Sequence, residues 1–144
     1  MRLSAKTLGL GTLALLLFAL PLASMPSFNP GDMIWDALNT VNGVTLKGKY
    51  KESPDNGLVD QSLEVELDNA LPNTTFTVKI KKKRLGTLTT DVFGTGIFRA
   101  QRLGVVPGPD GRPPKRKRIN TGDLVTVLNA SIGFSISADF QPRP

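Results

Sequence analysis

Two runs of positively charged residues are the features of this sequence whose types and spacing are best suited to chemistry. They are Lys81, Lys82, Lys83 and Arg84, and, directly after two prolines, Lys115, Arg116, Lys117 and Arg118. Clustered Lys and Arg side chains attract anionic polymers and release their counterions on binding. We interpret the two runs as solvated loops. The alternative hypothesis is that both runs form a polyanion-binding surface for acidic polysaccharide, lipopolysaccharide or extracellular DNA.

Neither basic run contains an aromatic side chain on which a nucleic-acid base would stack. The second run resembles a nuclear localisation signal, but the start of the chain, described below, indicates export. We expect no sequence-specific contact with nucleic acid, and we expect the partner to be an anionic polymer or another envelope component.

Three carboxylates at a spacing of two, Glu64, Glu66 and Asp68, form the second candidate cluster. Such carboxylates serve elsewhere as a cation site or as the acid and base of a glycoside hydrolase. Here they alternate with apolar residues, which is typical of the solvent face of a strand. We interpret them as a strand face that pairs with lysines, and we expect no enzyme activity and no catalytic residue.

Histidine and cysteine are both absent from the sequence. Their absence excludes disulfides, thiolate and imidazole metal ligands, and the Ser–His and Cys–His pairs of nucleophilic catalysis. Asp91 and Asp123 lie in glycine-containing turns and offer calcium one ligand each, but neither has a second carboxylate close by in the sequence. We interpret Asp91 as a turn residue that accepts hydrogen bonds from its own backbone, and we predict no metal and no cofactor.

The first 24 residues have the three-part layout of a secretory signal peptide. The parts are the cations Arg2 and Lys6, the apolar residues 7–22, and the exit Pro21-Leu22-Ala23-Ser24. Because the apolar stretch is short for a membrane span, we predict cleavage after Ala23 or after Ser24, with an uncleaved anchor as the alternative. The mature chain is then secreted or held in the periplasm or cell envelope, with no membrane span.

About 120 residues follow the leader, enough for one domain. We divide them into a junction segment, residues 25–42, and a β-rich domain, residues 43–144. In the junction, Asp32 is placed to cap a short helix that runs through Leu38. A loop whose Trp35 closes one end of the core is the alternative.

Alternation of apolar and polar residues begins at Val44 and recurs along the rest of the chain. It predicts strands near residues 44–51, 63–68, 75–81, 85–90, 96–101, 124–128 and 132–140. A long loop rich in proline, glycine and cations spans residues 103–119. No helical period is sustained after the leader, so we predict an all-β fold of about seven strands. It is either an antiparallel β-sandwich or a small partly open barrel.

The clearest predicted hairpin joins residues 63–68 to residues 75–80 through a turn at residues 69–73. In its register Leu67 faces Phe76, and Glu64 lies opposite Lys79. Cross-strand pairs of opposite charge stabilise a sheet by roughly 0.2–1 kcal/mol each. Across the whole domain, the residues predicted to be buried are Val65, Leu67, Phe76, Val78, Leu124, Val127, Phe134 and Ile136.

The order of turns and strands between residues 63 and 134 carries a resemblance. Its elements are Leu71-Pro72-Asn73, Phe76-Thr77-Val78, Leu85-Gly86-Thr87, Thr90-Asp91 with Gly94 and Gly96, and Gly122-Asp123-Leu124-Val125. In this order they resemble a small exported bacterial β-sandwich domain of uncharacterised function, with a layout similar to prealbumin-like (transthyretin-like) sandwiches. The basic run at residues 81–84 departs from that pattern, in which the turn is neutral or acidic. The resemblance implies the fold and export, and it carries over no catalytic residue.

Together these observations favour an exported, non-enzymatic β-sandwich with a structural or binding role in the cell envelope or extracellular space. The alternative is a polyanion-binding module that acts through the two basic runs.

Overall fold

The computed structural model describes residues 31–144 of the chain. The predicted signal peptide, residues 1–24, and its cleavage site lie outside these residues. Within residues 31–144 no helix is long and apolar enough to cross a membrane.

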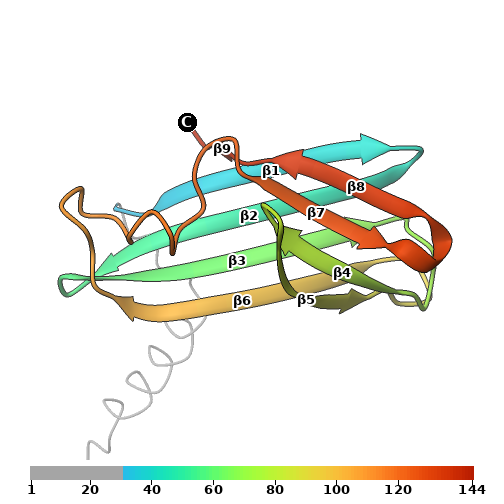
Figure 1. Ribbon diagram of the computed structural model, residues 1–144, viewed down its shortest axis with the longest axis horizontal. Coiled ribbons are helices and arrows are strands. Elements are labelled where there is room, and N and C mark those ends of the chain that lie inside the picture. The colour runs from blue at the N-terminus through green and yellow to red at the C-terminus, as the bar shows by residue number, and fades with distance from the viewer. Residues whose placement is uncertain (1–30) are drawn as a thin grey trace, which may run out of the picture.

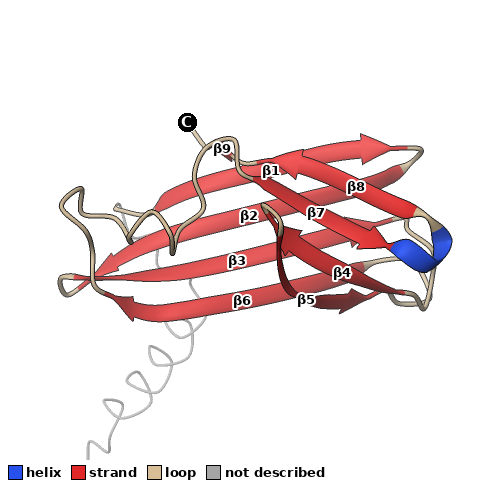
Figure 2. Ribbon diagram, viewed as in Figure 1, coloured by secondary structure: helices blue, strands red, loops and turns tan. Residues whose placement is uncertain are grey.

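Two antiparallel sheets face each other across one hydrophobic core (Figure 1). The strands are β1 (Met33–Val41), β2 (Val44–Asp55), β3 (Leu58–Asp68), β4 (Thr75–Ile80), β5 (Lys83–Thr89), β6 (Gly96–Val105), β7 (Leu124–Asn129), β8 (Phe134–Asp139) and β9 (Gln141–Pro142). One sheet has the order β6-β3-β2-β1-β9 and the other has the order β5-β4-β7-β8. The only helical element of residues 31–144 is a 3-10 turn, η1 (Ala130–Ile132) (Figure 2). The predicted all-β fold is therefore confirmed in its sandwich form, with nine strands in place of about seven.

Strand β1 replaces the short helix or loop predicted after Asp32, and both of those predictions are wrong. Residues 33–41 pair with β2 along their whole length. The two strands are joined by Asn42-Gly43, both at positive φ, 50° and 81°. Asn-Gly is the strongest short hairpin signal in a sequence, because the primed turns require positive φ. Trp35 is buried in the core, as expected of it in the loop alternative, but it occupies the inner face of a strand.

The predicted hairpin between residues 63–68 and 75–80 is also wrong. Strand β3 lies between β2 and β6 in the five-stranded sheet, and β4 lies between β5 and β7 in the other sheet. Residues 69–74 therefore cross from one sheet to the other, a step of about 10 Å in a sandwich. The predicted inner faces are nevertheless confirmed, since Leu63, Val65, Leu67, Phe76, Val78 and Ile80 are all buried. Alternation of apolar and polar residues determines which face of a strand is buried, but it does not determine which strands lie beside it.

The alternating carboxylates of β3 lie on the solvent face of the sheet and pair with cations, as predicted, but the partners are on different strands. Lys47 Nζ of β2 lies 2.9 Å from Glu66 Oε1 and 2.6 Å from Asp68 Oδ2. Arg99 Nε of β6 lies 2.7 Å from Glu64 Oε2. The hydrogen bond from Lys47 lowers the pKa of Asp68, and that same contact raises the pKa of Lys47.

The core contains six of the eight residues predicted to be buried: Val65, Leu67, Phe76, Val78, Val127 and Ile136. Phe134 is half-buried and packs edge-on against Phe76, with ring centroids 5.3 Å apart. Leu124 is 47% exposed, so its predicted burial is wrong. It lies at the first position of β7 in phase with Thr126 on the outer face, while Val125 and Val127 point inward.

The two sheets differ in length, and this difference positions the candidate site. Strands β2 and β3 have 12 and 11 residues, whereas β4, β7 and β8 have six each. Beyond the shorter sheet, the inner face of β2 and β3 is covered by the long loop between β6 and β7, residues 106–123 (Figure 1). We call this segment the covering loop.

Candidate anion-binding site

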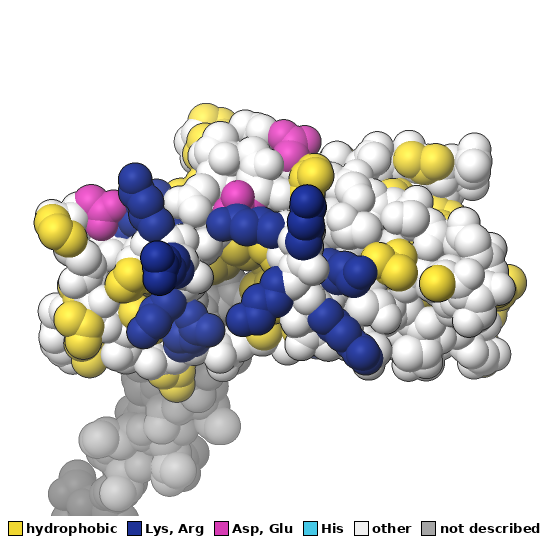
Figure 3. All heavy atoms as spheres, in the orientation of Figure 1, with side chains coloured by type: hydrophobic (Ala, Val, Ile, Leu, Met, Phe, Trp, Pro, Cys, Tyr) yellow, Lys and Arg dark blue, Asp and Glu magenta, His cyan; other side chains and the backbone are white. Residues whose placement is uncertain are grey.

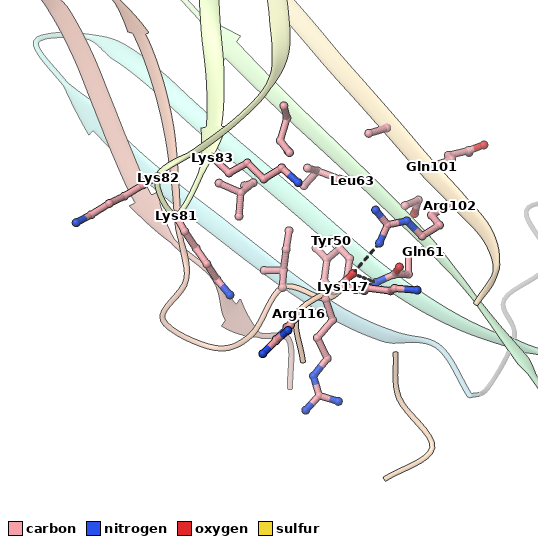
Figure 4. Close-up of a pocket in the computed structure, with 16 residues that line it drawn as sticks. Tyr50, Gln61, Leu63, Lys81, Lys82, Lys83, Gln101, Arg102, Arg116 and Lys117 are labelled. Atoms are coloured by element: carbon pink, nitrogen blue, oxygen red, sulfur yellow. Dashed lines mark hydrogen bonds between the residues drawn. The ribbon is translucent and has the colours of Figure 1, made fainter. Parts of the chain in front are cut away.

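A pocket of about 590 Å³ opens where the covering loop meets the shorter sheet. One side is the turn at Lys81-Lys82 between β4 and β5, and the other side is formed by residues 116–119 of the covering loop (Figure 4). The base is formed by inner-face residues of β3 and β6, including Leu63 and Ala100. The pocket therefore lies between segments that are far apart in the sequence.

Both basic runs reach this pocket. Six of the eight candidate residues line it, namely Lys81, Lys82, Lys83, Arg116, Lys117 and Arg118, whereas Arg84 and Lys115 do not. Arg102 of β6 is a seventh cation in the lining, and no Asp or Glu belongs to it. In space-filling view Lys and Arg side chains gather on this face around a hollow with hydrophobic side chains at its base (Figure 3). The charge of the lining is therefore of one sign and suits an anionic ligand.

Arg102 was missed by sequence reasoning because it stands outside both basic runs. In the structure it pairs with Gln61 across the β3–β6 ladder, so it shares the inner face of the sheet. Its Nη1 donates a hydrogen bond to the carbonyl oxygen of Lys117, 3.3 Å away. Only the pairing of β6 with β3, which the sequence did not indicate, brings this arginine to the pocket.

Two of the seven cations are already paired with carboxylates. Lys81 Nζ lies 3.1 Å from Asp123 Oδ2, and Arg118 Nη1 lies 2.6 Å from Asp110 Oδ2. The Arg118 side chain is almost fully buried and also donates to the carbonyl of Pro113, so it holds the covering loop together. Its hydrogen bond lowers the pKa of Asp110.

The remaining five cations of the lining form no ion pair with any residue in the range 31–144. They are Lys82, Lys83, Arg102, Arg116 and Lys117. A group of cations without counter-charges raises the local concentration of anions. Its side-chain donors can bind a ligand, although Arg102 Nη1 already contacts the carbonyl oxygen of Lys117.

A buried polar network fixes the covering loop against the sheet. Glu52 of β2 is fully buried and accepts two hydrogen bonds from Arg112, at 2.8 and 3.1 Å. The guanidinium carbon of Arg112 lies 4.4 Å from the centroid of the Trp35 ring, within cation–π range. The contact with Glu52 raises the pKa of Arg112. The carboxylate of Glu52, buried on the inner face of the sheet, is therefore paired with an arginine of the covering loop.

The same network extends to the edge of the pocket. The hydroxyl of Tyr50 donates to Glu52 Oε1 at 2.9 Å, and burial raises the pKa of that hydroxyl. Gln61 Nε2 donates both to the Tyr50 oxygen, at 2.5 Å, and to the carbonyl of Lys117, at 2.8 Å. The backbone of Lys117 is thereby held beside the pocket (Figure 4). Glu52 stands in phase with Leu46 and Tyr50, both of which are buried, so the alternation in the sequence places it on the inner face of the strand.

The base of the pocket is apolar. Leu63, Ile80 and Ile119 are buried there, and Leu85 is 40% exposed. Gln61 contributes a buried acceptor, Oε1, that has no hydrogen-bond partner within residues 31–144. The site therefore combines cations around its opening with hydrocarbon beneath them, and its lining contains no carboxylate to act as a general acid or base.

The two turn aspartates considered for calcium are used by their own turns. Asp91 Oδ1 accepts hydrogen bonds from the backbone of Phe93 and Thr95, at 2.9 and 3.0 Å, which confirms its interpretation as a turn residue. Asp123 Oδ2 accepts from the backbone of Asn120 at 2.7 Å and also contacts Lys81. Within the described part of the chain, no group of three or more Asp or Glu residues is placed to hold a metal ion.

No protein-family model, curated protein or solved structure matches this chain.

Proposed function

We propose that this protein is an exported, non-enzymatic β-sandwich that binds anionic ligands of the cell envelope or extracellular space in the pocket beside the covering loop. The observation that supports this proposal is the meeting of the two basic runs. They are separated in the sequence by most of β5, all of β6 and half of the covering loop, yet residues from both line one pocket whose lining contains no carboxylate. Solvated loops with no common role have no reason to converge in this way.

Elution from a heparin column by salt tests the binding proposal, because every phosphate- or sulfate-type contact contributes to the salt dependence. The test variant is Lys82→Gln/Lys83→Gln/Arg116→Gln/Lys117→Gln, which removes four unpaired cations of the pocket. The matched control is Lys49→Gln/Lys79→Gln/Arg84→Gln/Lys115→Gln, which removes four cations that neither line the pocket nor form an ion pair within residues 31–144.

We expect the pocket variant to elute at clearly lower salt than the control variant. Equal elution of the two variants would show that net charge alone controls retention and would overturn the proposal. So would passage of the unaltered protein through the column at about 0.1 M salt, where exposed charges still act over roughly 10 Å.

Export is the second part of the proposal, and the leader-like residues 1–24 together with the resemblance to exported sandwich domains support it. We expect the protein to be recovered outside the cytoplasm with Met25, or Ser24, as its first residue. N-terminal sequencing of the recovered protein measures this directly. Recovery of the intact Met1 form in a membrane fraction would favour the uncleaved anchor instead.

A further inference from the structure

We propose that the ligand of this pocket is a single-chain lipid phosphate, that is, one hydrocarbon chain carrying a phosphate monoester. This inference rests on the proposed function and goes further, since it specifies the chemistry of the anion. A polymer bound by charge alone requires a cationic surface, whereas this site also has a concave apolar base. A lining with both cations and an apolar base fits a ligand that has both an anionic head group and a hydrocarbon chain.

The apolar part of the ligand is indicated by the base of the pocket. Leu63, Ile80 and Ile119 form it from three different segments, and Leu85 lies at its edge with 40% of its surface exposed. Covering such a surface with a hydrocarbon chain is favourable by about 0.8 kcal/mol per buried methylene group. The volume of about 590 Å³ falls within the range of roughly 300–1,000 Å³ that is usual for sites of single small molecules. One chain, rather than the surface of a bilayer, fits this description.

The anionic part of the ligand is indicated by the cations that face the opening. Lys83 and Arg102 approach the space over Leu63 from opposite sides, whereas Lys82 points away from it (Figure 4). The planar guanidinium of Arg102 offers paired donors that match two phosphate oxygens, and Lys83 supplies a compact positive charge. Because neither Lys83 nor Arg102 has a carboxylate partner within residues 31–144, the two positive charges beside this space favour a doubly charged head group over a singly charged one.

The experiment is isothermal titration calorimetry with three probes. Decyl phosphate, below its critical micelle concentration, has both parts; inorganic phosphate has only the head; and decyl maltoside has only the tail. We expect decyl phosphate to bind at least about tenfold more tightly than either of the other two, a difference of about 1.4 kcal/mol.

Two variants test whether an apolar side chain of the pocket contributes to binding more than an equally exposed apolar side chain elsewhere on the surface. Leu85→Ser removes a lining side chain that is 40% exposed, and Ile97→Ser removes an equally exposed side chain of β6 that does not line the pocket. We expect Leu85→Ser to lower the affinity for decyl phosphate about fivefold or more and to leave the salt concentration of heparin elution unchanged. Ile97→Ser should change neither, and thermal unfolding of both variants establishes that they are folded.

The outcomes distinguish this inference from the proposed function. If decyl phosphate and inorganic phosphate bind equally and the heparin result holds, the site binds anions without a chain and the inference alone is overturned. If decyl maltoside binds as tightly as decyl phosphate, or if Leu85→Ser and Ile97→Ser weaken binding equally, the inference also fails. If the protein binds neither decyl phosphate nor heparin, both the inference and the proposed function fall.

Discussion

Among single residues, Lys81 stands at the backbone position least suited to its type. Five non-glycine residues within residues 31–144 have positive φ, and four of them are Asn42, Asn56, Asn69 and Asn73. Asparagine tolerates this left-handed conformation, whereas an ordinary side chain is disfavoured there by about 1–2 kcal/mol. The fifth is Lys81, at 58° and beside the pocket. A lysine therefore stands where asparagine would be less strained, and its Nζ pairs with Asp123.

Lys81→Asn should therefore stabilise the fold while it weakens anion binding. We expect a rise of up to about 1 kcal/mol in the free energy of unfolding, measured in urea. Relief of the strain at positive φ, about 1–2 kcal/mol, exceeds the loss of the exposed Lys81–Asp123 ion pair, about 0–1 kcal/mol. Lys82→Asn is the control, since it removes the same charge at a neighbour without positive φ. A larger fall in the urea midpoint for Lys81→Asn than for Lys82→Asn would contradict this account.

Glu52 is the buried residue on which the position of the covering loop depends. Glu52→Ala leaves Arg112 without its carboxylate and the Tyr50 hydroxyl without its acceptor. Loss of one partner of a buried ion pair costs about 3–5 kcal/mol, which urea unfolding measures. Trypsin should also cut the loop faster at residues 115–118. Glu64→Ala, on the solvent face, should change stability within about 0.5 kcal/mol; equal effects of the two variants would show that the network does not hold the loop.

Among the structural elements, the sequence predicted strand faces well and strand neighbours poorly. Leu63, Val65 and Leu67 are buried as their alternation predicts, because the period of a strand is a local property. Strand β2 is joined to β3 by the two-residue turn Asn56-Gly57, whereas the other partner, β6, follows β3 only after β4 and β5. Opposite charges on β3 and β4 were consistent with a hairpin, but Lys47 of β2 and Arg99 of β6 pair with the same carboxylates.

A pair of double-mutant cycles compares the two pairings. Lys47 and Asp68 should show favourable coupling in the free energy of unfolding at pH 7, since their atoms are 2.6 Å apart. Lys79 and Glu64, which the predicted hairpin would have paired, should show none. Because Lys47 lowers the pKa of Asp68, the coupling is present above the ordinary carboxyl pKa and is lost as the pH falls through the lowered value. Coupling between Lys79 and Glu64 of the same size as the first pair would contradict the observed strand order.

For the whole molecule, the two ends of the sandwich are built differently, and this explains where the pocket lies. At one end both crossovers between the sheets, residues 69–74 and 90–95, are joined by backbone hydrogen bonds. These run from Ala70 to Gly94, from Asn73 to Asp91 and from Thr90 to Thr74, at 3.0, 3.1 and 3.0 Å. At the other end no such crossover joins β4 and β5 to β3 and β6, so the covering loop and the basic turn meet there around an open space.

The sequence predicted the class of this fold and both basic runs, but it did not predict that the runs meet. Composition and alternation are local and are sufficient for an all-β assignment. The convergence of residues 81–83 with residues 116–118 depends on which strand enters which sheet and on the Glu52–Arg112 contact that holds the loop. Neither feature has a signature within a short window of sequence.

A close contact between β5 and β6 beside the pocket supplies a test of the whole architecture. Gly86 of β5 faces the ring of Phe98 on β6, and a Cβ atom at this glycine would lie 2.7 Å from Phe98 Cε2. The neighbours of these two residues include Leu85 and Ala100, which line the pocket. The two sheets are therefore in close contact at the edge of the pocket.

Gly86→Ala should force the ring of Phe98 or the two strands apart. We expect a loss of about 1–3 kcal/mol in the free energy of unfolding, as is usual for overpacking, together with weaker retention on heparin because the cations of the two sides separate. Gly108→Ala is the control, since its Cβ would meet no atom closer than 3.5 Å. If Gly86→Ala matched Gly108→Ala in stability, Phe98 would have room to move aside. The sheet spacing at this end would then be determined by the covering loop and its Glu52–Arg112 ion pair rather than by the packing of β5 on β6.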